Sequence, residues 1–240
     1  MGRFLCVWNC VLLLAFLFVP SAAREHVVGV LAKEGSAKAF SKWNSTFGTY
    51  LSENLKMPFR MQPLSFEEIY PAIEAESIDF LFANPSYFAC AELQYELQAI
   101  LSITNRVMGF PLEQFGGVIV RSAFRPEIKS TEDINNRIFE AVSWSSLGGY
   151  QMAWSELTRK GLSPLFSPSE LRFGKTHTHV IEDVVNGVVD VGTVRTDTIE
   201  RLILAGKLNA SDLVVLDPKN ASAEFPFQRT TPLYPEWPLA

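Results

Sequence analysis

The chain is poor in cysteine and histidine and contains no run of lysines or arginines. Its 240 residues include 3 cysteines and 3 histidines. These few side chains form no convincing set of metal ligands, so we expect neither a metal nor another cofactor. The formal net charge of -5 and the missing basic runs argue against nucleic acid as a partner. An anionic ligand would therefore need a local binding site.

The only long apolar run lies at the N-terminus. Arg3 precedes the apolar residues 11–19, and the small residues 21–23 follow them. This order is typical of a secretory signal peptide that is cleaved before Arg24. An uncleaved anchor is the alternative, but the run is shorter than the roughly 20 residues that span a bilayer. We expect residues 1–23 to be removed and the mature protein to be exported to the periplasm or the extracellular space.

The scarcity of cysteine also excludes a disulfide scaffold. Cys6 and Cys10 would leave with the signal peptide, and Cys90 would then be the single cysteine of the mature chain. Hydrophobic residues make up 48% of the sequence, which suffices for two small lobes or one large domain. Stability is therefore expected to come from hydrophobic cores.

Strand-like and helix-like segments alternate along the chain. Residues 26–31 are rich in β-branched side chains, and residues 38–55 carry apolar side chains at helical spacing. Such alternation predicts an α/β fold with mostly parallel sheets, in which ligands bind beyond the carboxyl ends of the strands. We expect further strands at 59–64, 78–83, 98–104, 117–121, 138–142, 171–173, 188–194 and 213–217, and further helices at 66–75, from 85, after 131, and at 149–159, 179–186 and 196–205.

Two polar stretches, residues 113–117 and 209–212, predict a hinge that the chain crosses twice. On this interpretation residues 24–115 form the first part of lobe 1 and residues 116–210 form lobe 2. Residues 211–240 then make the return crossing and the last part of lobe 1.

A serine and glycine turn is the strongest candidate for a binding site. Residues 144–150 read Trp-Ser-Ser-Leu-Gly-Gly-Tyr between a predicted strand and a predicted helix. Unpaired backbone N–H groups at such a helix start favour an anion or polar ligand. Alternatively, the glycines make a tight turn and a serine is an ordinary N-cap. The candidate ligand contacts here are Ser145, Ser146, Gly148, Gly149 and Tyr150.

Two further candidate groups lie near the ends of predicted strands. Residues 84–87, Asn-Pro-Ser-Tyr, offer ligand contacts at Asn84, Ser86 and Tyr87, although Asn-Pro is also a common turn signal. Residues 187–197 offer Thr193 and Arg195. The guanidinium of Arg195 can grip two oxygens of an anion, unless it instead pairs on the surface with Asp197 or Glu200.

His177 either hydrogen-bonds a ligand or caps the following helix. His177 and His179 are two residues apart, so they do not share a helix face and form no chelating pair. The sequence contains no Gly-x-Ser-x-Gly, no Walker loop and no His-Glu-x-x-His, and it shows no evident acid/base pair of carboxylates. We therefore expect a binding protein rather than an enzyme.

Together these segments resemble the phosphate/phosphonate-type periplasmic solute-binding family across nearly the whole mature chain. Within that family the chain is similar to the sensor domains of bacterial tetrathionate-type histidine kinases, in which Val-Arg-Thr-Asp and Tyr-Pro-Glu-Trp segments occur. The segments that carry the resemblance are 84–87, 116–121, 146–150, His177, 187–197 and 233–237.

The resemblance implies a two-lobed, type II periplasmic-binding-protein fold that closes on a small oxyanion-like ligand. Such proteins serve ABC-type uptake or sensing, with a membrane transporter or a signalling receptor as partner. The resemblance also implies that the cleft is lined by Tyr87, Ser146, Gly148, Gly149, Tyr150 and His177, with Arg195 nearby.

Two departures from the family pattern leave the ligand open. Phosphonate binders usually carry a Ser-Thr-Ser-Gly turn, whereas this chain has Leu147 and Gly148 in place of the middle hydroxyls. In the sensor-like members an aspartate often follows the histidine, and here Thr178 stands there. The alternatives are a ligand-free receptor ectodomain or a secreted enzyme in which His177 would exchange protons with Ser146 or Tyr87.

Overall fold

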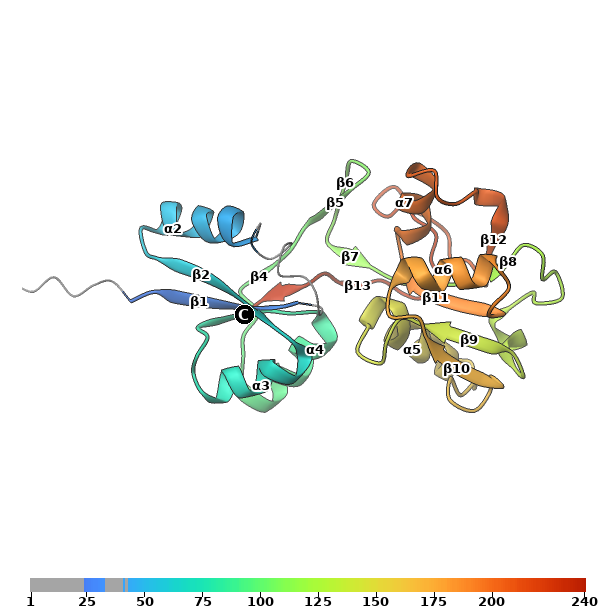
Figure 1. Cartoon of the computed structure of the whole chain (residues 1–240), viewed down its shortest axis with the longest axis horizontal. Helices are drawn as coiled ribbons and strands as arrows, with labels where there is room; N and C mark the ends of the chain where they lie inside the picture. The colour runs from blue at the N-terminus through green and yellow to red at the C-terminus, as the bar shows by residue number, and fades with distance from the viewer. Residues whose placement is uncertain (1–23, 33–40, 42) are drawn as a thin grey trace, which may run out of the picture.

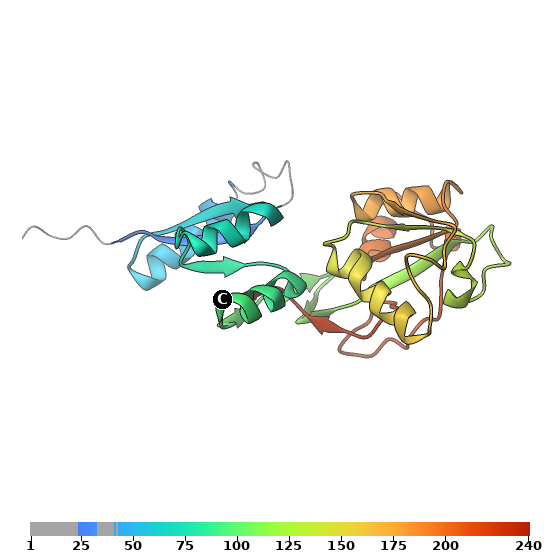
Figure 2. The ribbon, with the colours of Figure 1, turned by 90° about the horizontal axis from the view of Figure 1, so that it is seen from below.

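Two α/β units stand side by side and are joined by extended segments in the computed structural model (Figure 1). The structure describes residues 24–32, 41 and 43–240. The predicted signal peptide 1–23 and the start of the predicted helix 38–55 lie outside the described residues. Figure 2 shows the same two units from below, with the connecting segments between them. Among residues 24–32, 41 and 43–240, no helix combines the length and the apolar composition that a membrane crossing requires.

The first unit is built on a five-stranded sheet with the order β2-β1-β3-β14-β4. β1 pairs in parallel with β2 and β3, whereas β14 pairs antiparallel with β3 and β4. Because β14 comes from the end of the chain, this sheet joins residues from both ends of the sequence. The strands are β1 (His26–Leu31), β2 (Phe59–Leu64), β3 (Phe80–Phe82), β4 (Leu101–Ser102) and β14 (Pro238–Leu239).

Helices cover both faces of this sheet. α3 (Phe66–Glu74) begins with a capping box between Ser65 and Glu68, and α4 (Pro85–Tyr95) follows β3 directly. They pack over Leu31 and Leu81 on one face. The π-helical turn η1 (Asn44–Gly48) and α2 (Thr49–Leu55) pack over Val28 and Val30 on the other. Alternate residues of β1 thus enter two separate cores.

The second unit contains a five-stranded sheet with the order β10-β9-β11-β8-β12. β9 pairs in parallel with β10 and β11, and β8 pairs antiparallel with β11 and β12. The parallel arrangement predicted for most strands therefore holds only for part of each sheet. The strands are β8 (Gly117–Ser122), β9 (Ile138–Ala141), β10 (Glu170–Phe173), β11 (Val191–Arg195) and β12 (Leu213–Val215).

Helices also flank the second sheet and enclose two buried clusters. One cluster is centred on Ile119, Phe139 and Leu157, and the other on Val120, Val184 and Val194. The helical elements are η2 (Thr131–Ile134), η3 (Leu147–Gln151), α5 (Met152–Arg159), α6 (His177–Val185), α7 (Thr198–Leu204) and η4 (Ala210–Asp212).

The two units are linked by an antiparallel strand pair, β7 (Gln114–Phe115) and β13 (Tyr234–Pro235). Tyr234 pairs with Phe115, so the outgoing and returning segments lie next to each other (Figure 1). Beside them β5 (Asn105–Val107) and β6 (Phe110–Leu112) form a hairpin. The outgoing crossing lies within the predicted stretch 113–117.

The return crossing differs from the predicted position at residues 209–212. There, Asn209 and Asp212 form a capping box at η4, and the chain continues into β12 of the second sheet. The chain returns to the first unit only at β13 and β14. The polar residues at 209–212 therefore mark a capped turn rather than a hinge, because their side chains satisfy backbone groups locally.

Candidate functional site

A cavity of about 80 Å³ lies between the two units. The first unit contributes residues at the ends of β1 and β3, and the second contributes the turn after β9, the start of α6 and the end of β11. A ligand in this cavity would touch both units and a crossing segment at once. The lining residues are Leu31, Phe66, Asn84, Phe115, Ser143, Ser145, Ser146, Leu147, Gly148, His177, Arg195 and Trp237.

Asn84 contributes a polar side chain from the first unit to the cavity wall. It follows β3 and caps α4, because its Oδ1 accepts a hydrogen bond from the Tyr87 N–H at 2.9 Å. Its Nδ2 donates to the carbonyl oxygen of Ser145 at 3.5 Å, across the cavity. Asn84 is only 6% exposed. The amide is thus held in one orientation, with its N–H₂ end directed at the second unit.

The predicted serine and glycine turn forms the facing wall. Ser146 is the N-cap of η3, and its Oγ accepts a hydrogen bond from the Gly149 N–H at 3.2 Å. A Cβ on Gly149 would lie 2.5 Å from a methyl of Val142, and one on Gly148 would lie 3.0 Å from Phe115. The glycines are therefore required by close packing. Ser145, Ser146 and Gly148 line the cavity, whereas Gly149 is buried behind them.

His177 is the first residue of α6, but it is not the cap. That role belongs to Thr176, whose Oγ1 accepts a hydrogen bond from the His179 N–H at 3.1 Å. The Nδ1 of His177 accepts a hydrogen bond from the backbone N–H of Arg195 at 3.2 Å. Because Nδ1 is an acceptor, the proton of the neutral ring is assigned to Nε2. His177 thus joins the start of α6 to the end of β11 at the cavity wall.

The guanidinium of Arg195 is engaged by a buried carboxylate. Its Nη2 forms an ion pair with Oε1 of Glu236, and its Nη1 lies 3.5 Å from Oε2. Its Cζ lies 4.1 Å from the ring centre of Phe115. Asp197, an alternative partner in the sequence analysis, approaches Arg195 Nε at 4.0 Å but binds Arg201 at 2.6 Å. Glu200 instead accepts a hydrogen bond from the Gln228 N–H.

Besides Gly149, four predicted contacts lie outside the cavity. Tyr150 is 2% exposed and packs among Trp144, Trp154 and Phe173, and this burial raises the pKa of its hydroxyl above the ordinary value. Its helical position turns the ring into the core of the second unit. The other three are Ser86, Tyr87 and Thr193.

Tyr87 and Thr193 are held by their own units. The Tyr87 hydroxyl donates to the carbonyl oxygen of Phe66 at 2.5 Å, and its ring stacks on Tyr70. Burial, with smaller contributions from Tyr70 and Glu67, raises the pKa of Tyr87 to about 12. Thr193 is fully buried in β11. Tyr87 lies in the first turn of α4 after β3, and Thr193 lies within β11, but neither residue lines the cavity.

The apolar wall of the cavity was not predicted from the sequence. The predicted contacts are polar side chains, tyrosines and glycines, whereas Leu31, Phe66, Phe115 and Trp237 contribute apolar surface. Leu31 and Phe66 were assigned only to predicted elements. Trp237 belongs to the Tyr-Pro-Glu-Trp segment, which was a signal that this region mattered.

A larger hollow lies elsewhere, in the first unit. It has a volume of about 600 Å³ and a mainly apolar lining that includes Trp43, Phe47 and Leu101. It lacks the convergent polar groups that fix a small ligand, so we favour the cavity between the units. Among the residues that the structure describes, no group of three or more histidine, cysteine or acidic side chains is placed to hold a metal ion.

Comparison with known families and curated proteins gives consistent matches. The family model described as "ABC transporter, phosphonate, periplasmic substrate-binding protein" matches residues 28–240. The chain is also 23% identical over 214 residues to the tetrathionate sensor histidine kinase TtrS of Salmonella typhimurium. That match covers 89% of this chain but 36% of the kinase, so the chain spans little more than a third of that relative.

Solved structures give the same fold. PhnD1 of Prochlorococcus marinus in complex with methylphosphonate has a TM-score of 0.63 and 18% identity, covering 90% of this chain and 75% of that chain. A binding protein component of an ABC phosphonate transporter from Pseudomonas aeruginosa has a TM-score of 0.62 and 19% identity, covering 90% and 68%. These similarities confirm the predicted fold class of periplasmic binding proteins.

Proposed function

The chain belongs to the family of phosphonate-type periplasmic substrate-binding proteins of ABC transporters, and we propose that it closes over one small oxyanion-like solute in the cavity between its units. The observation that carries this proposal is the composition of the cavity wall. Asn84 from one unit meets Ser145 from the other there. A solute that bridges the units would favour the closed arrangement over an open one.

The hydrogen-bonding groups support an oxygen-rich ligand. The cavity wall carries the Asn84 amide, the hydroxyls of Ser143, Ser145 and Ser146, and the His177 ring. These groups can donate to ligand oxygens without carrying a net charge. The cavity volume of about 80 Å³ fits a small solute. PhnD1 was solved in complex with methylphosphonate, and the curated relative is a tetrathionate sensor, so phosphonates, phosphate and sulfur oxyanions are the candidate ligands.

The contacts support binding without turnover. An enzyme would need His177 to exchange protons with Ser146 or Tyr87. The Ser146 Oγ instead caps η3, the Tyr87 hydroxyl donates to Phe66, and His177 Nδ1 accepts from Arg195. Each candidate member of a proton-transfer set is thus occupied by a structural hydrogen bond.

The family and the N-terminal sequence support an exported protein. We propose that residues 1–23 direct export and that the mature protein works in the periplasm or at the cell exterior. Its partner would be a membrane transporter that receives the solute or a signalling receptor that responds to closure of the units. The similarity to both transporter components and a sensor kinase is compatible with either partner.

A thermal-shift screen of residues 24–240 tests this proposal. The panel is phosphate, phosphonates, phosphite, sulfate, thiosulfate and tetrathionate. A ligand that binds the native state raises the melting temperature in proportion to its occupancy, so a selective rise supports the proposal. Asn84→Ala should reduce that rise, whereas Asn54→Ala, the same change on exposed α2, should not. A flat response across the panel would favour the ligand-free ectodomain instead.

A further inference from the structure

A buried carboxylate stands behind the cavity's cationic side chain. Glu236 lies between β13 and β14 on the return crossing and is 0% exposed. It forms the ion pair with Arg195, and its Oε1 also accepts a hydrogen bond from Asn105 Nδ2 at 2.9 Å. Arg195 lines the cavity and Glu236 does not. The carboxylate therefore acts on a ligand through its charge and through Arg195, without direct contact.

The charges around Arg195 cancel. Arg195 is the one arginine or lysine among the described residues that line the cavity. Glu236 balances its charge directly, and Asp197, which approaches its Nε, is itself balanced by Arg201. Glu236 and Asp197 are both almost completely buried, so water screens their charges poorly. The attraction of Arg195 for an anionic ligand is consequently opposed by the repulsion from these nearby carboxylates.

We propose that Glu236 is a specificity-determining residue that makes the cavity prefer singly charged oxyanions over doubly charged ones. This inference rests on the proposed function. A dianion loses more hydration energy than a monoanion on entering the cavity, and here it gains no uncompensated cation in return. A monoanion loses less, and the hydroxyl and amide donors of the wall can hold it. The preference for monoanions thus arises partly from repulsion between the Glu236 carboxylate and the ligand.

Glu236 also has a structural role, because it connects Arg195 of the second unit with Asn105 of the outgoing segment. Loss of that role would weaken all ligands alike. Loss of the charge alone would instead change the ratio of affinities for ligands of equal shape and unequal charge. The experiment therefore measures that ratio.

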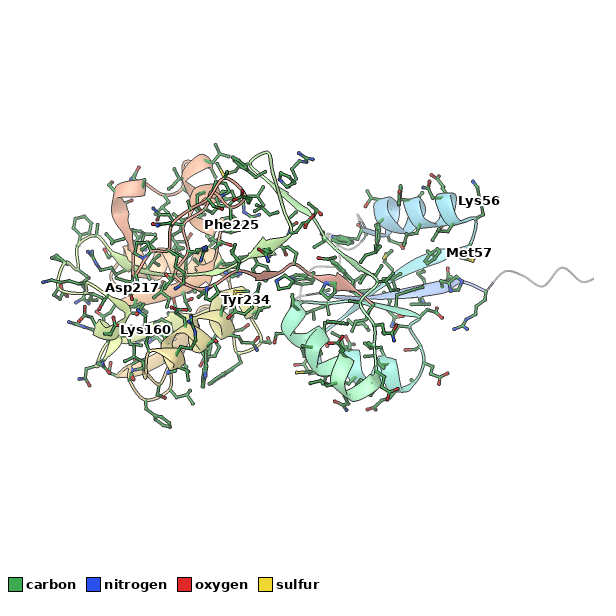
Figure 3. The ribbon with its side chains drawn as sticks, turned by 180° about the vertical axis from the view of Figure 1, so that it is seen from behind. Lys56, Met57, Lys160, Asp217, Phe225 and Tyr234 are labelled. Carbon is green, nitrogen blue, oxygen red and sulfur yellow. The ribbon has the colours of Figure 1, made fainter. Side chains whose placement is uncertain are left out.

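The test uses sulfate and perchlorate, which are both tetrahedral and carry two and one negative charges. Affinities are measured by calorimetric titration for the wild-type chain, Glu236→Gln and the control Asp217→Asn. Glutamine keeps the shape of the side chain and an oxygen that can accept from Asn105. Asp217 pairs with Lys160 within the second unit, so its substitution removes the same charge outside the cavity (Figure 3).

We expect Glu236→Gln to raise the ratio of sulfate affinity to perchlorate affinity by about tenfold. Without the Glu236 charge, the attraction of Arg195 for a ligand grows with the ligand's charge, so the dianion gains more than the monoanion. Asp217→Asn should leave the ratio unchanged. An unchanged ratio in Glu236→Gln, or no titration of either anion, would overturn the inference. If the wild-type chain binds an oxyanion of the thermal-shift panel while the ratio stays constant, the inference fails and the proposed function stands.

A second variant covers the case in which Glu236→Gln does not fold. Arg195→Gln combined with Glu236→Gln removes both charges and leaves no unpaired buried ion. Its affinity ratio should equal that of the wild type, because the net charge near the ligand is unchanged. A ratio that differs between the double variant and the wild type would contradict charge cancellation at this pair.

Discussion

The Nδ1 of His177 accepts the backbone N–H of Arg195, so the first residue of α6 is tied to the last residue of β11 at the wall of the cavity. The bond fixes the ring and leaves its Nε2 edge as the proton-bearing side. The two residues stand 18 positions apart in sequence, and the packing of α6 against β11 brings them together.

This bond leads to a prediction for His177. His177→Ala removes the acceptor and should cost about 1 kcal/mol of unfolding free energy, the usual value of one hydrogen bond. His177→Asn places an oxygen near the position of Nδ1 and should recover most of that loss. Urea denaturation of both variants measures the difference. Equal stabilities of the two variants would show that the bond contributes nothing.

Arg195 should be important for stability as well as binding. Arg195→Ala leaves Glu236 buried and unpaired, which typically costs about 3–5 kcal/mol. The combined change Arg195→Met and Glu236→Leu removes both charges and should be much less destabilising. Urea denaturation compares the three proteins. If Arg195→Ala were as stable as the double variant, the unpaired Glu236 charge would not destabilise the fold, and the prediction would be wrong.

The stability of the second unit should depend on pH through Glu140. Burial, then the nearby Asp183 carboxylate, raises the pKa of Glu140 from 4.5 to about 7, while His179 and Arg172 act in the opposite direction. The folded protein therefore binds a proton that the unfolded chain has released between these two values. The resulting stabilisation is present below about pH 4.5 and is lost as the pH rises through about 7.

Glu140→Gln should remove this contribution. Unfolding free energies are compared at about pH 5 and about pH 8, on either side of the folded-state pKa. The wild type should lose more stability across this interval than Glu140→Gln. Glu92→Gln, which alters an exposed carboxylate on α4, serves as the control. An identical pH dependence in wild type and Glu140→Gln would contradict the prediction.

Gly149 should tolerate no side chain. The added Cβ of Gly149→Ala would overlap a methyl of Val142, which directly follows β9, and the Oγ of Ser146, which lines the cavity. We expect a loss of about 3 kcal/mol, as for overpacking of a tight core. Gly161→Ala meets no atom within 4 Å but has a φ of +78°, so it should lose about 1 kcal/mol through backbone strain alone. Thermal or urea unfolding measures the stability of both variants, and equal losses in Gly149→Ala and Gly161→Ala would contradict the prediction.

Local signals in the sequence predicted much of the fold and part of the candidate site. Asn84 before Pro85 and Ser146 before the glycine pair occupy the N-cap positions that their side chains favour. These preferences act over a few residues and can be read directly. The direction of the Tyr150 side chain could not be read from the sequence, because it depends on how η3 packs against the second sheet.

The pairing of Arg195 with Glu236 could not be read from local pattern either. The sequence placed Asp197 and Glu200 within reach of Arg195, since both follow it closely. The actual partner lies 41 positions away on the returning segment. Only the pairing of β7 with β13, which brings that segment back across the molecule, places the two side chains together.

Phe115 belongs both to the crossing and to the cavity wall. It pairs with Tyr234 in the crossing ladder, it lines the cavity, and its ring supports the guanidinium of Arg195. If the units close over a solute as we propose, bending of the crossing would move part of the cavity wall, and the bound solute would press on the strand that bends. The size of the solute would then limit how far the units can rotate toward each other.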